Sequence, residues 1–229
     1  MNALRHIAVR MLVAFVIAAA SAGAGWWFFV RDTAALATSA PAIPADLQET
    51  STLSSVDSSG IVDYRVLSDR SDVTLFADAT LAGLTISSGA TDATSDISGT
   101  LYLSSEGLTL DPSRYSVLTV GLSNLEIGGV ATDTGVMATF TATEIDGYDP
   151  AIPEGEEQSL QLSGTLDLLS VEAPLTWNVK ARVSGDVLTV LATTSFNYTA
   201  FNIPALSLAG PVSVGDDVTL QVQLIALAA

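Results

Sequence analysis

Side chains that commonly carry enzymatic chemistry are scarce in this sequence. The 229 residues include no cysteine and one histidine, His6, close to the N-terminus. The chain after His6 therefore contains neither the Ser-His-Asp nor the Cys-His arrangement of hydrolases, and no thiolate or imidazole ligand for a metal ion. We expect a protein that is not an enzyme and that holds neither a metal ion nor a catalytic cofactor.

Carboxylates are dense in one place, the stretch EIDGYDPAIPEGEE at residues 144–157. Oxygen-rich loops can bind calcium, and two carboxylates in different environments can hydrolyse glycosides. The spacing does not fit an EF-hand loop, and nothing in the pattern gives two of these acids different surroundings. We interpret the stretch as a solvated acidic turn. Its acids include Asp146, Asp149, Glu154, Glu156 and Glu157.

The overall charge excludes one class of partner. The chain has 25 acidic residues against 8 basic ones, a formal net charge of −17. A field of this sign repels phosphate backbones, so we expect no binding to nucleic acid. With 48% hydrophobic residues, the chain is long enough to form one sizeable core. Nothing in its composition points to a particular oligomeric state.

The alternation of apolar and polar residues predicts the secondary-structure elements that would position any functional site. Residues 160–168 place Leu160, Leu162, Gly164, Leu166 and Leu168 at every second position, and residues 175–183 repeat the pattern after a break at 170–174. Side chains alternate across a strand, so each run predicts a strand with one dry face. The pattern recurs between turn signals throughout 61–229, without an amphipathic helix. The predicted strands are 61–67, 71–78, 94–103, 115–125, 137–145, 158–169, 174–184, 187–199 and 216–227.

These eight or nine antiparallel strands predict an all-β domain. A closed barrel and a two-sheet sandwich both fit the alternation, which favours the barrel slightly.

An uncharged run precedes this domain. Residues 11–30 carry no charge, and as a helix they would span about 30 Å, one bilayer core. Arg5 and Arg10 come before the run, which predicts a single-pass anchor with its N-terminus in the cytoplasm and the domain outside. The alternative is a cleaved secretory signal, since small residues at 20–24 fit a cleavage site. The aromatic residues 26–29 favour a retained helix at the cell membrane.

We therefore expect three regions. Residues 1–31 form a signal anchor, residues 32–60 a flexible spacer rich in Ala, Ser, Thr and Pro, and residues 61–229 the β domain.

Short motifs in the β domain have a recognisable order. A Gly-x-Leu strand leads through a proline-containing turn into a second strand, followed by a Phe-x-x-x-x-Phe-x-Ile-Pro element and an Asp-x-Val-x-Leu closing strand. This order resembles the YceI-like family. The residues that carry the resemblance are Gly164, Leu166, Pro174, Phe196, Phe201, Ile203, Pro204, Asp216, Val218 and Leu220, with Tyr64, Ser71 to Leu75, Leu81 and Gly99 in the N-terminal half.

One departure from the family pattern lies in the middle of the domain. Thr132 and Asp133 are followed almost at once by Met137, where the family has a longer segment that could form a wall or lid. The resemblance is therefore to a YceI-like domain shortened in the middle.

The resemblance implies a lipocalin-like antiparallel barrel of about eight strands, exported from the cytoplasm, that holds a long isoprenoid or quinone-like chain in its lumen. The inward-facing positions mix Leu and Val with Gly and Ala, which we interpret as a lumen with room for an apolar lipid. A filled core is the alternative, and it would make the domain a cell-surface structural or interaction module without a ligand. The candidate ligand-binding residues are Val73, Leu75, Leu101, Phe140, Leu166, Trp177, Phe196 and Phe201.

Overall fold

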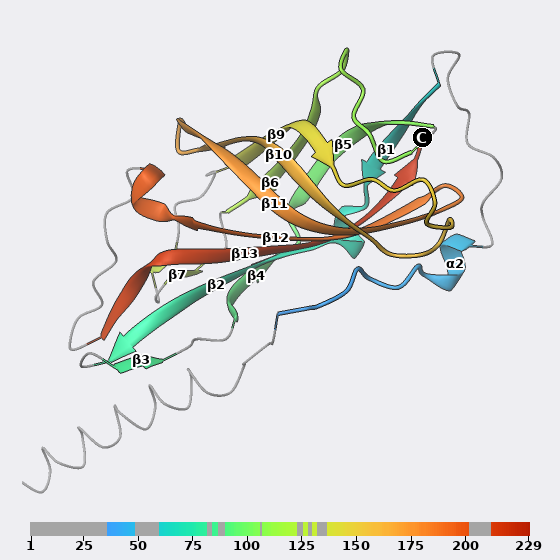
Figure 1. The fold of residues 1–229 in the computed structure, drawn as a ribbon. Coiled ribbons are helices and arrows are strands. Elements are labelled where there is room, and N and C mark those ends of the chain that lie inside the picture. Colours follow the sequence, from blue (N-terminus) through green and yellow to red (C-terminus); the bar gives the residue numbers. More distant parts are fainter. Residues whose placement is uncertain are drawn as a thin grey trace, which may run out of the picture.

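Eight antiparallel strands of this chain close into a barrel (Figure 1). The computed structural model describes residues 36–48, 60–81, 84–86, 90–105, 107–122, 126–127, 130–131, 137–201 and 212–229. The strands follow each other round the barrel in the order β1, β5, β6, β9, β10, β11, β12 and β13, and β13 pairs with β1 to close it. This confirms the all-β prediction and selects the barrel over the sandwich.

The bounds of the barrel strands lie within a few residues of the alternating runs in the sequence. They are β1 (Ile61–Val66), β5 (Ile97–Ser104), β6 (Ser116–Gly121), β9 (Met137–Asp146), β10 (Gln158–Leu168), β11 (Val171–Ser184), β12 (Val187–Asn197) and β13 (Val212–Ala228).

Three further strands extend one side of the barrel. The long β13 pairs with β1 through its C-terminal end and with β2 (Asp72–Leu81) through residues 212–223. In turn, β2 pairs with β3 (Leu84–Ile86) and β4 (Ala90–Thr94). β1 pairs with β5, and β2 pairs with β4, the strand that precedes β5 in the chain. β1 and β2 are therefore two segments of one long strand, which the short helix η1 (Ser68–Arg70) interrupts.

The remaining described elements are small. They are the helical turns α2 (Ala45–Gln48) and η2 (Tyr198–Phe201) and the two-stranded ladder of β7 (Glu126–Ile127) and β8 (Val130–Ala131).

The β10–β11 hairpin turn is tighter than the sequence indicated. Only Leu169 and Ser170 lie between the strands, with φ of 55° and 64°, the positive values that a two-residue type I′ turn requires. Pro174, expected in the turn, lies inside β11 opposite Thr165. Among the described residues, the ladder of β11 with β12 begins only at Asn178, so Pro174 lies outside that ladder, as prolines in strands commonly do.

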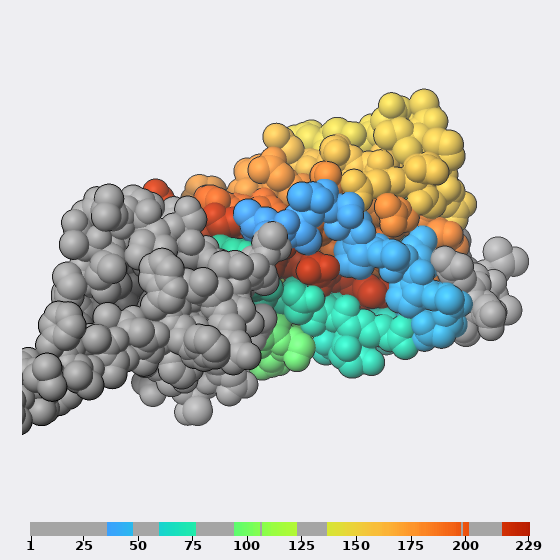
Figure 2. Space-filling view, turned by 90° about the horizontal axis from the view of Figure 1, so that it is seen from below, coloured from blue at the N-terminus to red at the C-terminus, as the bar shows by residue number. Residues whose placement is uncertain are grey.

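Residues 36–48, which we call the strap, lie along the outside of the barrel. Figure 2 shows this segment in blue, crossing parts of the barrel coloured orange and red. The Ala37 N–H donates to Gln221 Oε1 at 2.8 Å, and Gln221 Nε2 donates back to the Ala37 carbonyl at 3.1 Å. The Ala40 N–H donates to Glu157 Oε2 at 2.8 Å.

At its C-terminal end the strap is held by charge. Two nitrogens of Arg70 donate to the two carboxylate oxygens of Asp46 at 3.1 and 2.6 Å. Part of the predicted spacer thus has a fixed position on the barrel, because its backbone finds side-chain partners there that its composition does not reveal. The predicted anchor at residues 1–31 lies outside the described residues. None of the helices in the described part of the chain has the length and apolar character needed to cross a bilayer.

Replacing Gln221 is expected to release the strap. Gln221→Ala removes both hydrogen bonds to Ala37, each contributing about 1 kcal/mol, while β13 keeps its backbone ladder. We predict faster cleavage within residues 36–48 by elastase, which cuts after small residues, measured by mass spectrometry of the fragments. Gln223→Ala, at the next outward position of β13, is the control and leaves cleavage unchanged. Equal cleavage of the two variants would show that the two hydrogen bonds between Gln221 and Ala37 do not hold the strap.

Candidate functional site

The barrel interior contains a cavity of about 110 Å³ bounded entirely by apolar side chains. Its wall comes from β2, β5, β6 and every strand from β9 to β13, together with the segments that follow β5 and β6. A surface with no polar side chain favours an apolar occupant, because a polar one would lose its hydrogen bonds to water without replacement. The lining residues are Val73, Ile97, Leu101, Leu103, Leu108, Leu118, Val120, Leu122, Ala138, Phe140, Ile145, Leu160, Leu162, Leu166, Trp177, Val179, Ala181, Leu188, Val190, Ala192, Leu220, Val222 and Leu224.

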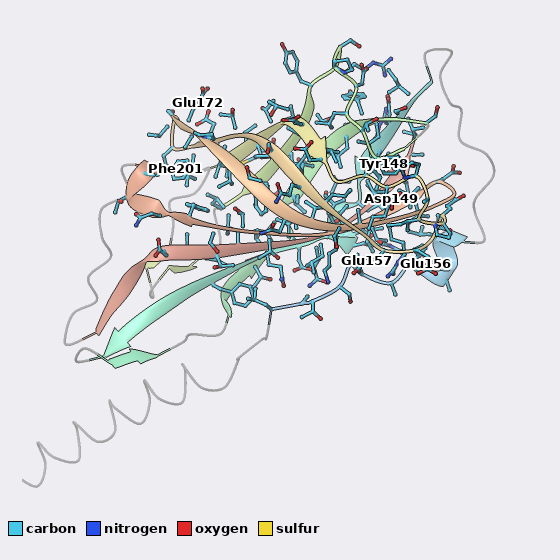
Figure 3. All side chains as sticks on the ribbon, in the orientation of Figure 1. Tyr148, Asp149, Glu156, Glu157, Glu172 and Phe201 are labelled. Carbon is cyan, nitrogen blue, oxygen red and sulfur yellow. The ribbon has the colours of Figure 1, made fainter. Side chains whose placement is uncertain are left out.

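The two ends of the barrel differ. Figure 3 shows Phe201 and Glu172 at one end, which we call the hairpin end because the β10–β11 turn lies there. It shows Tyr148, Asp149 and Glu156 at the opposite end, which we call the loop end after the connection between β9 and β10. The apolar cavity extends from Leu108 near the loop end to Ala138 near the hairpin end.

At the loop end the cavity adjoins a second, larger hollow of about 480 Å³. Leu103, Leu108 and Ala181 line both spaces and lie between them. On the far side of these residues the hollow has an acidic rim that includes Glu154 and Asp186. At the loop end, apolar side chains thus lie between the two spaces, and carboxylates lie at the outer rim.

Tyr64 lies in the wall of the second hollow and is 6% exposed. Burial, with the added effect of the Asp186 and Glu154 carboxylates, raises the pKa of Tyr64 to about 12 from its ordinary 10. The neutral phenol is therefore the form that the folded barrel favours.

This pKa predicts an alkaline loss of stability. Below pH 10 the phenol is neutral in the folded and unfolded chain, whereas between pH 10 and 12 only the unfolded chain loses the proton, which favours unfolding. The loss grows to about 2–3 kcal/mol near pH 12, at about 1.4 kcal/mol per pKa unit. Chemical denaturation across this range measures it. Tyr64→Phe abolishes this part of the pH dependence, and Tyr115→Phe, at a residue 81% exposed, leaves it unchanged. Identical pH profiles for wild type and Tyr64→Phe would contradict the assignment.

An aromatic pair narrows the middle of the cavity. The rings of Phe140 and Trp177 meet edge to face, with centroids 5.9 Å apart and planes at 78°. The Phe140 ring occupies the space over Gly164, where an added Cβ would lie 2.5 Å from Phe140 Cζ and 2.3 Å from the Thr141 carbonyl oxygen. This inward glycine therefore accommodates a neighbouring ring and does not open the lumen.

Of the eight candidate ligand-binding residues, five line the cavity and three lie beyond it. The five are Val73, Leu101, Phe140, Leu166 and Trp177. The other three are buried or half-buried but nearer the hairpin end, where the Phe196 and Phe201 rings pack edge to face at 5.2 Å and Leu75 lies opposite Leu220. Contact of any of the eight with a ligand stays a prediction.

Alternation identified the inward face correctly but not the depth along the barrel axis. Phe196 shares its face with the lining residues Val190 and Ala192, yet it lies past the end of the cavity. The same alternation could have added lining residues that the candidates omit, among them Leu160 on β10 and Leu188 on β12.

The acidic stretch makes hydrogen bonds and ion pairs with the protein itself. Glu157 lies 3.7 Å from Arg182 and accepts the strap N–H described above, and Asp149 Oδ1 accepts the Ala151 N–H at 2.9 Å. Glu154 accepts the N–H of Gly185 at the β11–β12 turn. Within the described residues no group of three or more acidic or histidine side chains is arranged to hold a metal ion. These carboxylates thus connect the loop end to the strap and to a neighbouring turn.

Comparison with known proteins confirms the family resemblance over part of the chain. Residues 130–226 match the YceI-like domain, which covers the C-terminal motifs from Gly164 to Leu220. The N-terminal motifs, such as Tyr64 and Gly99, precede the matched range. No curated protein matches the chain.

Two solved structures resemble this one at low sequence identity. One is a polyisoprenoid binding domain from Saccharophagus degradans implicated in plant cell wall breakdown, with 15% identity, a TM-score of 0.46, and coverage of 72% of this chain and 98% of that one. The other is BcnA of Burkholderia cenocepacia, with 18% identity, a TM-score of 0.47, and coverage of 70% of this chain and 98% of that one.

Filling the cavity tests whether it admits apolar molecules. An apolar protein cavity of about 150 Å³ binds benzene or xenon, so we predict that this one of about 110 Å³ binds xenon. Ala192→Leu adds three carbon atoms at a lining position opposite Val179 and Val222, and we expect it to abolish the xenon-induced shifts of nearby methyl resonances. Ser195→Leu adds a larger side chain at an exposed position of the same strand and leaves the shifts in place. Unchanged shifts in Ala192→Leu would place the xenon elsewhere.

Proposed function

We propose that this chain, whose residues 130–226 match the YceI-like domain, binds a long apolar lipid of isoprenoid or quinone-like type inside its barrel and catalyses no reaction. The observation that carries the proposal is the cavity bounded only by apolar side chains along the barrel interior. Each methylene group moved from water into such a space contributes about 0.8 kcal/mol, so no charged anchor is needed.

The lipid enters from the hairpin end. At the loop end Leu103 and Leu108 lie between the cavity and a hollow with an acidic rim, whereas the hairpin end exposes the large apolar side chains of Met137 and Leu169. Such side chains suit the approach of a hydrocarbon chain, and the acidic rim does not.

The present volume of the cavity is small for a long lipid. About 110 Å³ holds a short part of an isoprenoid chain, so the remainder requires side chains in the wall to change rotamer. Leucines and Phe140 provide this adjustment, since they have alternative staggered conformations within an apolar wall.

The small volume also favours a second candidate function. In that alternative the barrel interior is a packed core, and the domain is a structural or interaction module of the cell surface. Both candidate functions assume the same location, in which residues 1–31 anchor the chain in the membrane and the domain lies outside the cytoplasm. Neither function requires nucleic acid or a catalytic cofactor.

Extraction of the purified full chain separates the two functions. We expect organic solvent to release an isoprenoid or quinone-like species at about one molecule per chain, detected by mass spectrometry. Lipid that accompanies residues 1–31 is present equally in Ala192→Leu, whereas lipid from the lumen is lost in that variant because the larger leucine side chain would fill the cavity. The exposed substitution Ser195→Leu keeps the species. Equal amounts in wild type and Ala192→Leu would favour the module without a ligand.

A further inference from the structure

The hollow at the loop end has no part in the proposed lipid binding. Its volume of about 480 Å³ lies within the range of small-molecule sites, about 300–1,000 Å³. Three segments surround it: the chain after β5, the connection between β9 and β10, and the β11–β12 turn. Figure 3 shows two of its lining residues, Tyr148 and Glu156, at this end of the barrel. The hollow is therefore large enough to hold a ligand of its own.

The charged side chains that line this hollow all have one sign. Glu154 and Glu156 are exposed and Asp186 is half-buried, and no lysine or arginine of the described chain lines the hollow with them. Toward the barrel the lining is apolar, with Val62 and Leu108 buried. Among the described residues these acids are not grouped as metal ligands. The combination of a negative rim and an apolar floor suits an organic cation with an apolar body.

Tyr64 is an independent indication of a ligand. Its side chain is 6% exposed, and it lines the hollow and not the apolar cavity. Within the part of the chain that the structure describes, its hydroxyl has no hydrogen-bond partner. The two carboxylates that contribute to its raised pKa, Asp186 and Glu154, line the same hollow, which indicates that the phenol oxygen faces this space. A buried hydroxyl without a partner is uncommon in proteins, so this one is available to a bound molecule.

We propose that the loop-end hollow binds a small organic ammonium ion, which donates an N–H to the Tyr64 hydroxyl and whose charge is balanced by Glu154 and Asp186. The hydroxyl oxygen can accept this bond while its own hydrogen rotates away, and a primary ammonium has further donors for the carboxylates. The apolar body of the ion lies against Val62 and Leu108. This site is separate from the lumen and goes beyond the proposed function.

A free amine is favoured over a lysine side chain of a partner protein. Tyr64 is recessed, and the floor of the hollow offers apolar surface to a body that lies wholly inside it. A lysine stem is tied to its backbone and brings no such body.

Three probes with one carbon skeleton test the charge and the donor separately. They are 2-phenylethylammonium, its uncharged counterpart 2-phenylethanol, and its N,N,N-trimethyl derivative, which keeps the charge and has no N–H. Titration of the full chain near neutral pH is followed by the amide resonances of Gly155 and Gly185, which line the hollow. We expect the primary ammonium to bind about tenfold more tightly than either of the other probes, the effect of one charge-assisted hydrogen bond.

Substitutions in the hollow separate the two contributions. Tyr64→Phe is expected to lose about tenfold in affinity for the primary ammonium and nothing for the trimethyl derivative, whose retained binding shows an intact hollow. Glu154→Gln keeps an acceptor for the Gly185 N–H and weakens both cations by a few-fold. Tyr115→Phe, at an exposed tyrosine, and Glu172→Gln, at an exposed carboxylate of the hairpin end, are the matched controls and leave binding unchanged.

The possible results each decide the inference. Equal binding of the three probes, or no binding by any of them, would overturn the site. Equal losses in Glu154→Gln and Glu172→Gln would show a general attraction to an acidic surface and would overturn it too. If Nα-acetyl-lysine methylamide bound as tightly as 2-phenylethylammonium, the assignment to a small molecule would be wrong.

The lipid lumen is tested separately. Ala192→Leu, whose larger side chain would fill the apolar cavity, is expected to leave cation binding unchanged. Loss of cation binding in Ala192→Leu would place the cation in the lumen and overturn the inference.

Discussion

The closed antiparallel register is the constraint on which the rest of this structure depends. Once β13 pairs with both β12 and β1, each strand has a fixed neighbour on either side, and every second side chain must point into the lumen. A shift of one residue in any ladder would move its apolar residues outward and its polar residues inward. The apolar wall of the cavity is a direct result of this register.

Within that register, the size of the lumen is decided by pairs of residues on neighbouring strands. The ring of Phe140 lies over Gly164, and the side chain of Leu118 similarly approaches Gly99. Both glycines face inward, but the volume that they leave is taken up by the neighbouring strand. What remains is a narrow cavity whose dimensions depend on a few large rotatable side chains, a condition that suits an occupant of one-chain width.

Alternation was enough to predict the eight barrel strands and β2, their inward faces and, with the family resemblance, the closed barrel, but it missed the short strands β3, β4, β7 and β8. It could not predict how far along the barrel axis each inward residue lies. Leu75 and Phe196 occupy the same face of their strands as lining residues, yet they lie beyond the cavity. The break expected at residues 170–174 is a two-residue turn, and β11 begins at Val171, so that Pro174 lies opposite Thr165 within the strand. The position of the strap depends on contacts such as Ala37 with Gln221, 184 residues apart, for which no local pattern exists.

The docked strap has a mechanical consequence. Because Ala37 is clamped to β13, a pull on the chain preceding residue 36 acts on the flank of the barrel and not on its rim at Ile61. Docking of residues 36–48 also removes these 13 residues from the linker before the barrel, which shortens its maximum extended length by roughly 40 Å. Under the proposed anchoring by residues 1–31, a domain attached at its flank through a short linker has fewer orientations open to it than one on a long free linker. Such an attachment would favour one end of the barrel for contact with a neighbouring surface.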